Sequence, residues 1–513
     1  MGYDSFRNRW VVLVACIWLE CCTGASYGFS IYSQTIKTRF GYNQEQLDTI
    51  AVFSNLGVFG GILSGLLYQY CSAWLVLLVG ALHNLAGYAV LWLFLTGRMA
   101  SPALWELCVV TCVAMNCELY YNTASMVTCV TNFPDNRGIV VGLMKGCAGL
   151  SSAVLSTVWQ VLFPGSDGSS FLIVAAIVPS AVALMIMPVV RKYEPENCEI
   201  GSSRTMQFLA MASVPIVFLA MFLMGSAFWD ANSLQGDRVE FAIILVIMAL
   251  PLYVAWKAIA HERTSTTNSK LLEPLNTKGS SNYSDKYCII EYANCSLWRA
   301  ICSLDFFLVF FTSAVAIASG VVAINNMSQV ATSLGYAQQD ITIFVTLISV
   351  AQFLGRFGCG VLSDYFLSKF EVGRPLLTAL VELILCCGNL LIIIAGTFPR
   401  ALYLGCIFIG FSFGANWCLN SITVSDLFGL GHFGALYNVV MMGNPVVSYV
   451  LSIWVAGYLY DKEGAKQGGG QCKGSTCFNL TFIILASICV LATLTSSILW
   501  WRTKHIYRKR TSK

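Results

Sequence analysis

Apolar residues recur along this chain in long runs that short polar segments interrupt. A window of about 20 predominantly apolar residues predicts a membrane-spanning helix, because a helix of that length crosses the hydrocarbon core. Fourteen windows qualify, near 10–30, 47–67, 73–95, 103–127, 138–161, 171–190, 206–228, 241–259, 305–324, 341–362, 376–396, 401–424, 434–458 and 478–500. The pattern therefore predicts an all-α polytopic membrane protein.

Polar residues interrupt the apolar pattern at two places, within the first apolar run and in a long stretch near the middle of the chain. The first apolar run follows Arg7 and Arg9 and is broken by Glu20, so we interpret it as a retained helix and not a signal peptide. Residues 257–298 form one long stretch rich in Ser, Thr, Asn and Lys, with few apolar side chains to bury. We expect this stretch to be a flexible linker between two halves.

Two short repeats relate those halves. Residues 61–65 are similar to residues 360–364, at an offset of 299, and residues 137–138 are similar to residues 433–434. A half of six short-looped spans needs only about 200 residues, so the excess corresponds to two inserted spans and the linker. The predicted domains are a six-helix bundle over 1–192, two extra helices with a cytoplasmic linker over 193–300, and a second six-helix bundle over 301–513.

Composition and charge narrow the class of protein. Only 11% of the 513 residues are charged and 57% are hydrophobic, whereas soluble domains carry about 25% charged residues. The net charge of +4 is spread over loops, which argues against nucleic acid as a partner. If the N terminus is inside, twenty of the 30 Lys and Arg fall on the cytoplasmic face and eight on the other. We expect both termini to be cytoplasmic, in the plasma membrane or an endomembrane.

The cysteines and histidines indicate no redox or metal chemistry. Most of the 21 cysteines lie within apolar runs, where a thiol behaves as a small hydrophobe. Cys472 and Cys477 flank a polar loop and could close a disulfide if that loop faces an oxidising compartment. The four histidines lie far apart, so we expect no metal site, no cofactor and no enzymatic activity.

A specific group of segments opens the fifth span, at residues 132–134, 137–138, 142–146 and 149–151. Further characteristic segments lie at residues 24–33, 46–47, 305–307, 326–329, 333–336, 354–356, 427–430 and 433–438. Together they resemble the nodulin-like branch of the major facilitator superfamily, the plant group of the nuclear fusion defective type. This resemblance implies the major facilitator fold and a secondary transporter, with a more distant likeness to oxalate–formate exchangers and monocarboxylate carriers. Gly65 departs from the pattern, because the superfamily signature carries an acid there.

Lys145 and Arg356 are the basic residues inside predicted spans. Ionisable groups in a span cost about 2.5–3.5 kcal/mol on insertion scales and by default face the bundle interior or a cavity. Lys145 lies among Gly142, Gly146 and Gly149, which allow a neighbouring helix to approach closely. We interpret Lys145 as a cation that binds an anionic substrate or shares a proton-linked pair. The alternative is a structural lysine that snorkels to the cytoplasmic face about 10 Å away.

Arg356 precedes Asp364 by eight residues. The same spacing occurs in the monocarboxylate-carrier-like branch, and the resemblance implies that this arginine meets a substrate carboxylate. A guanidinium offers a fixed donor fork that matches the two carboxylate oxygens. The alternative is a helix-end arginine paired with Asp364 or with a backbone carbonyl.

The span around residue 118 is the most polar of the set. Asn116, Tyr121 and Asn122 surround Glu118 and are candidate substrate-binding residues, and helical spacing places Asn122 and Glu118 on one face. A carboxyl in a low-dielectric pocket can load and release a proton near neutral pH. The candidate proton carriers are Glu118, Glu20 and Glu382. The alternative is a hydrogen-bonded cluster that holds spans together.

Gly360 and Asp364 begin the superfamily's loop signature, and Lys369 and Arg374 follow them. We expect Asp364 to sit at a helix N-terminus, to pair with these bases and to latch one state of a transport cycle. Arg137, which opens the fifth span, is the third candidate gating residue.

Taken together, these features predict a monomeric secondary transporter in the lipid bilayer. We expect alternating access and a small organic anion such as a monocarboxylate as substrate, with possible coupling to protons. The competing hypothesis is a membrane receptor or scaffold that keeps a transporter fold without transporting.

Overall fold

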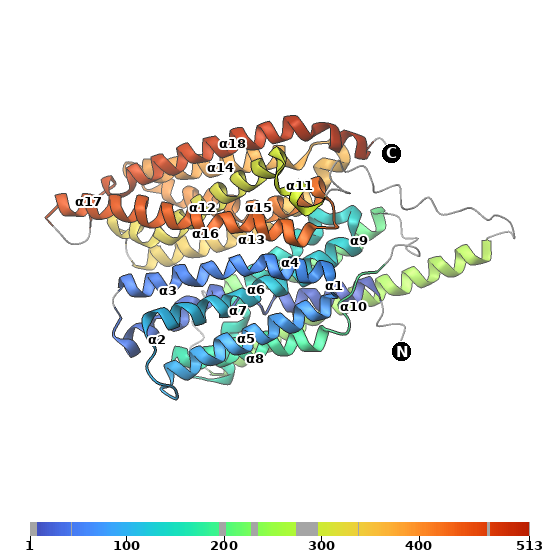
Figure 1. Cartoon of the computed structure of the whole chain (residues 1–513), viewed down its shortest axis with the longest axis horizontal. Helices are drawn as coiled ribbons and strands as arrows, with labels where there is room; N and C mark the ends of the chain where they lie inside the picture. Colours follow the sequence, from blue (N-terminus) through green and yellow to red (C-terminus); the bar gives the residue numbers. More distant parts are fainter. Residues whose placement is uncertain are drawn as a thin grey trace. The chain divides into compact units, whose positions relative to one another are not determined.

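The computed structural model describes residues 8–42, 44–193, 202–226, 234–272, 296–336, 338–468 and 472–511. These residues form helices and contain no β-strand. Figure 1 labels the elements along the chain. They are α1 (Arg9–Glu20), η2 (Ala25–Gly28), α2 (Phe29–Phe40), α3 (Gln44–Leu56), η3 (Gly57–Gly60), α4 (Gly61–Tyr70), α5 (Ala73–Leu95), α6 (Leu104–Asn132), η4 (Pro134–Asn136), α7 (Arg137–Leu162), α8 (Gly168–Ile186), α9 (Ser202–Ser226), α10 (Leu234–Leu272), α11 (Leu297–Ile301), α12 (Leu304–Ser333), α13 (Gln338–Phe370), α14 (Arg374–Ile394), α15 (Arg400–Phe428), α16 (Phe433–Tyr449), the π-helix η7 (Val450–Gly457), α17 (Tyr458–Lys466) and α18 (Thr476–Thr511).

The chain divides into two compact units. Unit 1 comprises residues 1–288 and 430–435, and unit 2 comprises residues 289–429 and 436–513. Helices α6 and α15 have the same length of 29 residues in the two units. Arg137 opens α7 and Phe433 opens α16, so the two similar segments each lie at the start of a helix.

Twelve helices in the described residues are long and apolar enough to cross a membrane. Two of the fourteen predicted spans are not among them. The span expected over 10–30 is broken, because α1 ends at Glu20 and a short 3-10 turn precedes α2. The span expected over 103–127 is the continuous helix α6, whose length suffices but whose many polar side chains lower its apolar content. The protein is a multi-pass membrane protein.

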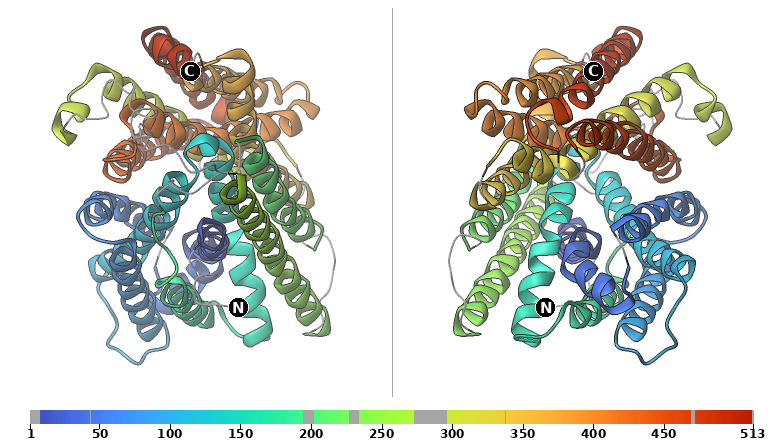
Figure 2. Two further views of the ribbon diagram at one scale, coloured as in Figure 1. Left: turned by 90° about the vertical axis from the view of Figure 1, so that its right-hand side faces the viewer. Right: turned by 90° about the vertical axis from the view of Figure 1, so that its left-hand side faces the viewer.

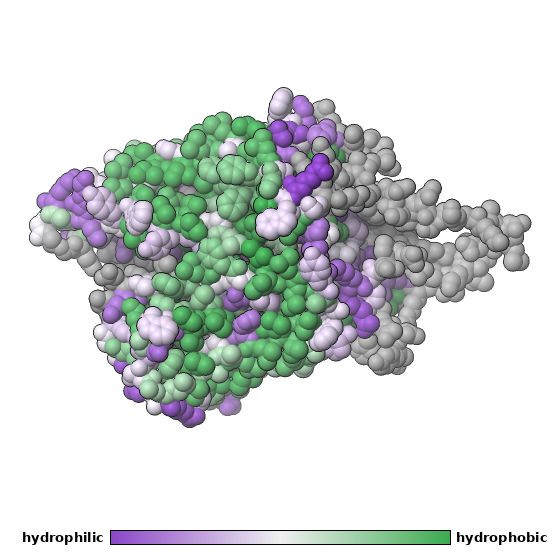
Figure 3. Space-filling view, viewed as in Figure 1, coloured by the Kyte–Doolittle hydropathy of each residue, from purple (hydrophilic) through white to green (hydrophobic). Residues whose placement is uncertain are grey.

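Apolar side chains cover the outer faces of these helices in the view of Figure 3. Leu82 and Met185 of unit 1 and Leu491 and Leu494 of unit 2 are exposed. Contiguous exposed apolar surface of this extent is unusual for a soluble protein. In a bilayer the same side chains face lipid.

A proline in α8 shows how a buried helix break is compensated. Pro179 lacks an N–H group, which frees the carbonyl of Ala175 four residues earlier. Asn84 of α5 donates through Nδ2 to the carbonyls of Ala175 and Ala176, at 2.9 and 2.8 Å, and to Ser180 Oγ at 2.9 Å. This amide therefore satisfies backbone groups that no water could reach in a bilayer.

Helices α9 and α10, which the sequence predicted as an insertion, lie side by side within unit 1 and pack on α1 and α7 (Figure 2). Glu262 of α10 accepts hydrogen bonds from Asn8 Nδ2 at 2.9 Å, from Arg9 Nη2 at 2.9 Å and from Trp10 Nε1 at 2.9 Å. Glu240, near the other end of α10, accepts from Thr157 of α7 at 3.3 Å. The inserted pair is thus fastened to α1 and α7.

In unit 2, α13 and α15 pack at close range through glycines. A Cβ at Gly355 would lie 2.1 Å from the carbonyl oxygen of Phe411, and one at Gly414 would lie 2.1 Å from that of Gln352. The loop before α18 is closed by a disulfide between Cys472 and Cys477, the pair that the sequence singled out.

Candidate functional site

Lys145 lies eight residues into α7, inside unit 1, and its side chain is 4% exposed. Its Nζ donates to Oδ1 of Asn122 on α6 at 3.2 Å. Gly142 and Gly146 lie within a turn of it on the same helix, and they allow close packing there. The ammonium therefore points toward α6 within unit 1.

Glu20, the last residue of α1, completes the site, and it is 1% exposed. Ser125 of α6 donates through Oγ to Oε1 of Glu20. The carboxyl of Glu20 interacts electrostatically with Lys145 and with Glu118. Glu118, Asn122 and Ser125 follow one another at spacings of four and three residues, so they share one face of α6.

We call Lys145, Asn122, Glu20 and Ser125 the Lys145 centre. Three helices that are not consecutive in sequence supply it, namely α1, α6 and α7. It holds a cation, a neutral amide, a hydroxyl and an acid that can take up a proton. Such a set can bind an anion and change its own charge.

Asn116 and Tyr121 have other neighbours. Asn116 Nδ2 donates to the carbonyl of Gly57 in η3 at 3.1 Å, because a shift of six residues turns a helical side chain by about 240° away from Asn122. Tyr121 is fully buried, and its ring lies 3.0 Å from where a Cβ of Gly80 on α5 would stand. The sequence grouped these residues with Lys145, whereas the structure brings only Asn122 to it.

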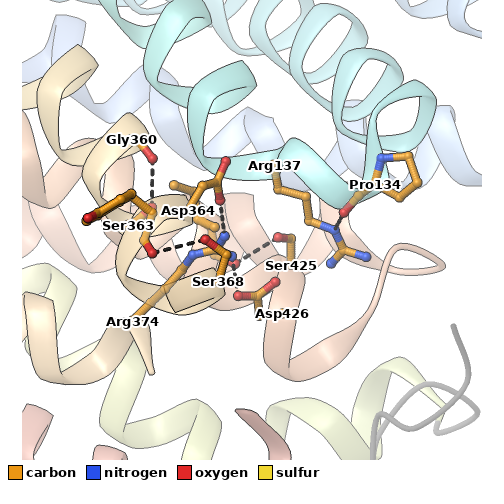
Figure 4. A network of polar contacts seen from close by, with 11 residues as sticks. Pro134, Arg137, Gly360, Ser363, Asp364, Ser368, Arg374, Ser425 and Asp426 are labelled. Carbon is orange, nitrogen blue, oxygen red and sulfur yellow. Dashed lines mark hydrogen bonds and ion pairs between the residues drawn. The ribbon is translucent and has the colours of Figure 1, made fainter. Parts of the chain in front are cut away.

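A cluster of three charged side chains forms in unit 2 (Figure 4). Arg374, the first residue of α14, donates through Nη2 to Oδ1 of Asp364 and through Nη1 to Oδ2 of Asp426. The three side chains are 2%, 8% and 1% exposed. The sequence predicted the pairing of Asp364 with a base and missed Asp426. A signal was present, because Asp426 is an acid directly beyond the predicted end of an apolar span.

Two expectations about this cluster are corrected. Asp364 does not sit at a helix N-terminus, since α13 continues to Phe370 without a glycine or proline to stop it. Lys369 donates to the hydroxyl of Tyr365 at 2.9 Å on the exposed surface, while Arg374 pairs with Asp364. The chain turns back between the two helices at Glu371, which has a positive φ of 55°.

The remaining gating candidates belong to different units. Gly360 of α13 accepts a hydrogen bond from Ser363 Oγ at 2.8 Å. Arg137 opens α7 in unit 1, is 4% exposed, and donates through Nε to the carbonyl of Pro134 at 3.0 Å. That contact fastens the turn before α7 to the helix that carries Lys145.

Arg356 and Glu382 are both buried in unit 2. Arg356 lies on α13 next to Gly355, at the close approach to α15, and is 3% exposed. Glu382 lies on α14, is 0% exposed, and accepts a hydrogen bond from Ser496 of α18 at 2.9 Å. Neither is part of the Lys145 centre, which unit 1 builds alone.

Two relatives are similar to this chain, one along nearly its whole length and one over a third of it. It is 26% identical over 535 residues to Protein NUCLEAR FUSION DEFECTIVE 4 of Arabidopsis thaliana, which covers 98% of this chain and 90% of that protein. It is 23% identical over 177 residues to "Probable transporter MCH1" of Yarrowia lipolytica, over 33% of this chain and 35% of that protein.

The fold is that of solved transporters. The E. coli proton:xylose symporter XylE, a major facilitator superfamily protein, aligns over 96% of this chain and 95% of its own, with a TM-score of 0.59 and 13% identity. Residues 9–256 match the family model described as Nodulin-like, and residues 286–509 match the model described as NFD4, C-terminal domain. Each half of the chain is thus similar to one of these two family models, and the chain has the major facilitator fold.

Proposed function

We propose that this protein is a secondary active transporter that works by alternating access and carries a small organic anion such as a monocarboxylate. The observation that carries the proposal is the buried Lys145 ammonium beside Asn122 and Glu20. The fold shared with XylE, a proton:xylose symporter, and the name of the MCH1 relative support transport. A receptor or scaffold would gain nothing from the cost of a buried cation.

Anion binding follows from the chemistry of the centre. The ammonium of Lys145 is a compact positive charge with three donors, and Asn122 offers an amide beside it. A carboxylate that enters the centre hydrogen-bonds both groups. Asn116 and Tyr121 act as positioning residues that hold α6 against η3 and α5.

Coupling to protons follows from Glu20. While Glu20 is ionised, its carboxylate competes with a substrate anion for the charge of Lys145. Protonation of Glu20 removes that competitor, so proton uptake favours anion binding, and by linkage the anion favours proton uptake. The half-buried Glu118, which also interacts with Glu20, is the second acid of this system.

Unit 2 supplies recognition and gating in this proposal. Arg356 presents a donor fork to the substrate carboxylate. The contacts of Arg374 with Asp364 and Asp426 latch α13, α14 and α15 together in one state of the cycle. Within α13, Gly360 accepts a hydrogen bond from Ser363, and in unit 1 Arg137 holds the start of α7 through Pro134.

The moving bodies are the six-helix halves 1–192 and 301–513, with the two extra helices of 193–300 as an insertion. Both termini face the cytoplasm, as the distribution of basic residues predicts. Cysteine accessibility labelling at the two termini in sealed vesicles tests this orientation. Labelling from the outer face would contradict it.

The function is tested with purified protein in liposomes. We expect uptake of a labelled monocarboxylate, faster with an inward proton gradient, and none of a neutral sugar of similar size. The Glu20→Gln variant, which imitates the protonated acid, should bind the anion but no longer respond to the gradient. Absence of flux for a broad panel of organic anions would favour the receptor hypothesis instead.

A further inference from the structure

Adjacent ends of α9 and α10 carry a basic surface that the Lys145 centre does not use. The apolar span of α9 begins at Arg204, and that of α10 ends at Glu262. Arg204 Nη1 lies 3.0 Å from His261 Nε2, so the two span ends lie at the same level. Because an apolar span ends where the hydrocarbon core ends, this level marks a membrane–water interface.

Exposed aromatic side chains of α10 mark the same interface. Tyr253 and Trp256 are 52% and 54% exposed, and their rings stack with the centroids 6.1 Å apart. Tyrosine and tryptophan gather at the headgroup level of a bilayer, because each has an apolar body and a polar tip. Lys257 follows Trp256, is exposed, and has its Nζ 4.9 Å from the centre of the Tyr253 ring. Its ammonium therefore lies at the headgroup level.

This surface holds two positive charges, those of Arg204 and Lys257. A guanidinium keeps its protons, so Arg204 donates to His261 Nε2 and the imidazole orients it. Helical spacing places Lys257 one turn before His261, on the same face of α10. Neither base forms a salt bridge within the described part of the chain. Glu262, next to His261 in the chain, is paired with Arg9 at 2.9 Å.

Apolar stripes continue from these charges toward the middle of both helices. The exposed side chains that form them are Met211, Val214, Phe218 and Met221 on α9 and Val246 and Leu250 on α10. Spacings of three and four residues keep each set on one face of its helix. The surface thus combines a cationic end with apolar stripes, which is complementary to the headgroup and acyl chains of an anionic phospholipid.

We propose that this surface binds a phospholipid with a phosphomonoester headgroup, of which phosphatidic acid is the simplest. A phosphomonoester carries a charge of about −1.5 to −2 at pH 7 and three strong acceptor oxygens, which matches two cations. The other N–H donors of Arg204 bind two of these oxygens, and the ammonium of Lys257 donates to the third. A phosphodiester carries only one negative charge and matches less well. Because the apolar stripes receive the acyl chains, the occupant is a lipid and not free phosphate.

Native mass spectrometry of the purified full chain in mild detergent tests the proposal, because it counts bound lipids one by one. For the first lipid bound, we expect phosphatidic acid to bind about 30-fold tighter than phosphatidylcholine with the same acyl chains. Each basic group near an anionic headgroup contributes roughly fivefold in affinity. Phosphatidylserine should lie between the two. The double variant Arg204→Gln/Lys257→Gln should lose most of this preference.

The matched control is Lys462→Gln on α17 of unit 2. Lys462 is also exposed and one turn after a tyrosine, with Nζ 5.8 Å from the centre of the Tyr458 ring. This variant should keep the native preference. If the double variant does not fold, Arg204→Lys serves instead, since it keeps the charge, loses the fork and should bind phosphatidic acid several-fold more weakly.

Four results would overturn the proposal. One is an undiminished preference for phosphatidic acid in a folded double variant. A second is equal affinity for all three lipids. Displacement of bound phosphatidic acid by inorganic phosphate would assign the charges to free phosphate. A dimer that the native chain forms and the double variant does not would assign the surface to a second copy of the chain. The site shares no residue with the Lys145 centre, so each result is independent of transport.

Discussion

Each unit buries a basic side chain, but the two are held in different ways. Arg374 of unit 2 lies between the carboxylates of Asp364 and Asp426. Lys145 of unit 1 donates to the neutral amide of Asn122 and interacts with the carboxyl of Glu20 through its charge. Both side chains are almost fully buried.

These two arrangements suit different roles. A guanidinium has a rigid fork that matches carboxylates, so the Arg374 cluster is fixed in geometry and ties three helices together. An ammonium is a point charge on a flexible stem and can exchange partners. Because Glu20 can be neutralised by a proton, the surroundings of Lys145 can change charge. The arginine suits a latch, whereas the lysine suits a binding site.

The largest effect is expected from Arg374→Ala. This change leaves two buried carboxylates without a cation, which costs about 3–5 kcal/mol of stability. Thermal unfolding of the purified protein in detergent measures the loss. The variant that also carries Asp364→Asn and Asp426→Asn should recover most of it, because no buried charge then remains. If Arg374→Ala unfolded at the native temperature, the Arg374 cluster would not be the fixed structural contact that distinguishes unit 2 from the Lys145 centre.

Lys145→Ala should leave folding largely intact and reduce anion uptake. Losing a hydrogen bond to a charged group costs about 1.5–3 kcal/mol, which corresponds to roughly 10- to 150-fold in uptake. Lys145→Arg keeps the charge and serves as the control. Uptake in liposomes at the native rate after Lys145→Ala would show that this lysine is only structural.

The Arg356→Lys variant tests whether the planar guanidinium of Arg356, and not only its positive charge, recognises the substrate carboxylate. The lysine keeps the charge but loses bidentate recognition of a carboxylate. We expect the apparent KM for a monocarboxylate to rise about tenfold, which corresponds to a loss of about 1.4 kcal/mol of binding free energy. Undiminished transport would assign Arg356 to the packing of α13 on α15.

Lys369→Ala should have the smallest effect. Its hydrogen bond to Tyr365 lies on the exposed surface, and exposed contacts of this kind contribute about 0–1 kcal/mol. Unfolding temperature and uptake should match the native protein. A loss as large as that of Arg374→Ala would place Lys369, and not Arg374, in the latch.

Much of the fold was predictable from local sequence. Runs of about 20 apolar residues mark spans, because the bilayer sets one length scale for every helix. Hydropathy alone misjudges a span where polar side chains are frequent or where a helix breaks. Glu20 ends α1 midway through an apolar run, and α6 carries so many polar groups that it is apolar only in part.

The site was predictable only within one helix at a time. Spacing along α6 placed Glu118 and Asn122 on one face, and the structure adds Ser125 to that face. The partnership of Arg374 with Asp426 spans 52 residues and two helices. Pairing at that distance depends on how α14 packs on α15, which no local pattern encodes.

The sequence alone determined that the chain is a multi-pass helical membrane protein, because hydropathy is a property of single residues and windows. Tertiary structure decided which groups meet. It joined Lys145 to Asn122 and Glu20, gave Asp364 to Arg374 in preference to Lys369, and set Glu382 beside the hydroxyl of Ser496. Those choices follow from helix packing, where side chains far apart in the chain share one buried space.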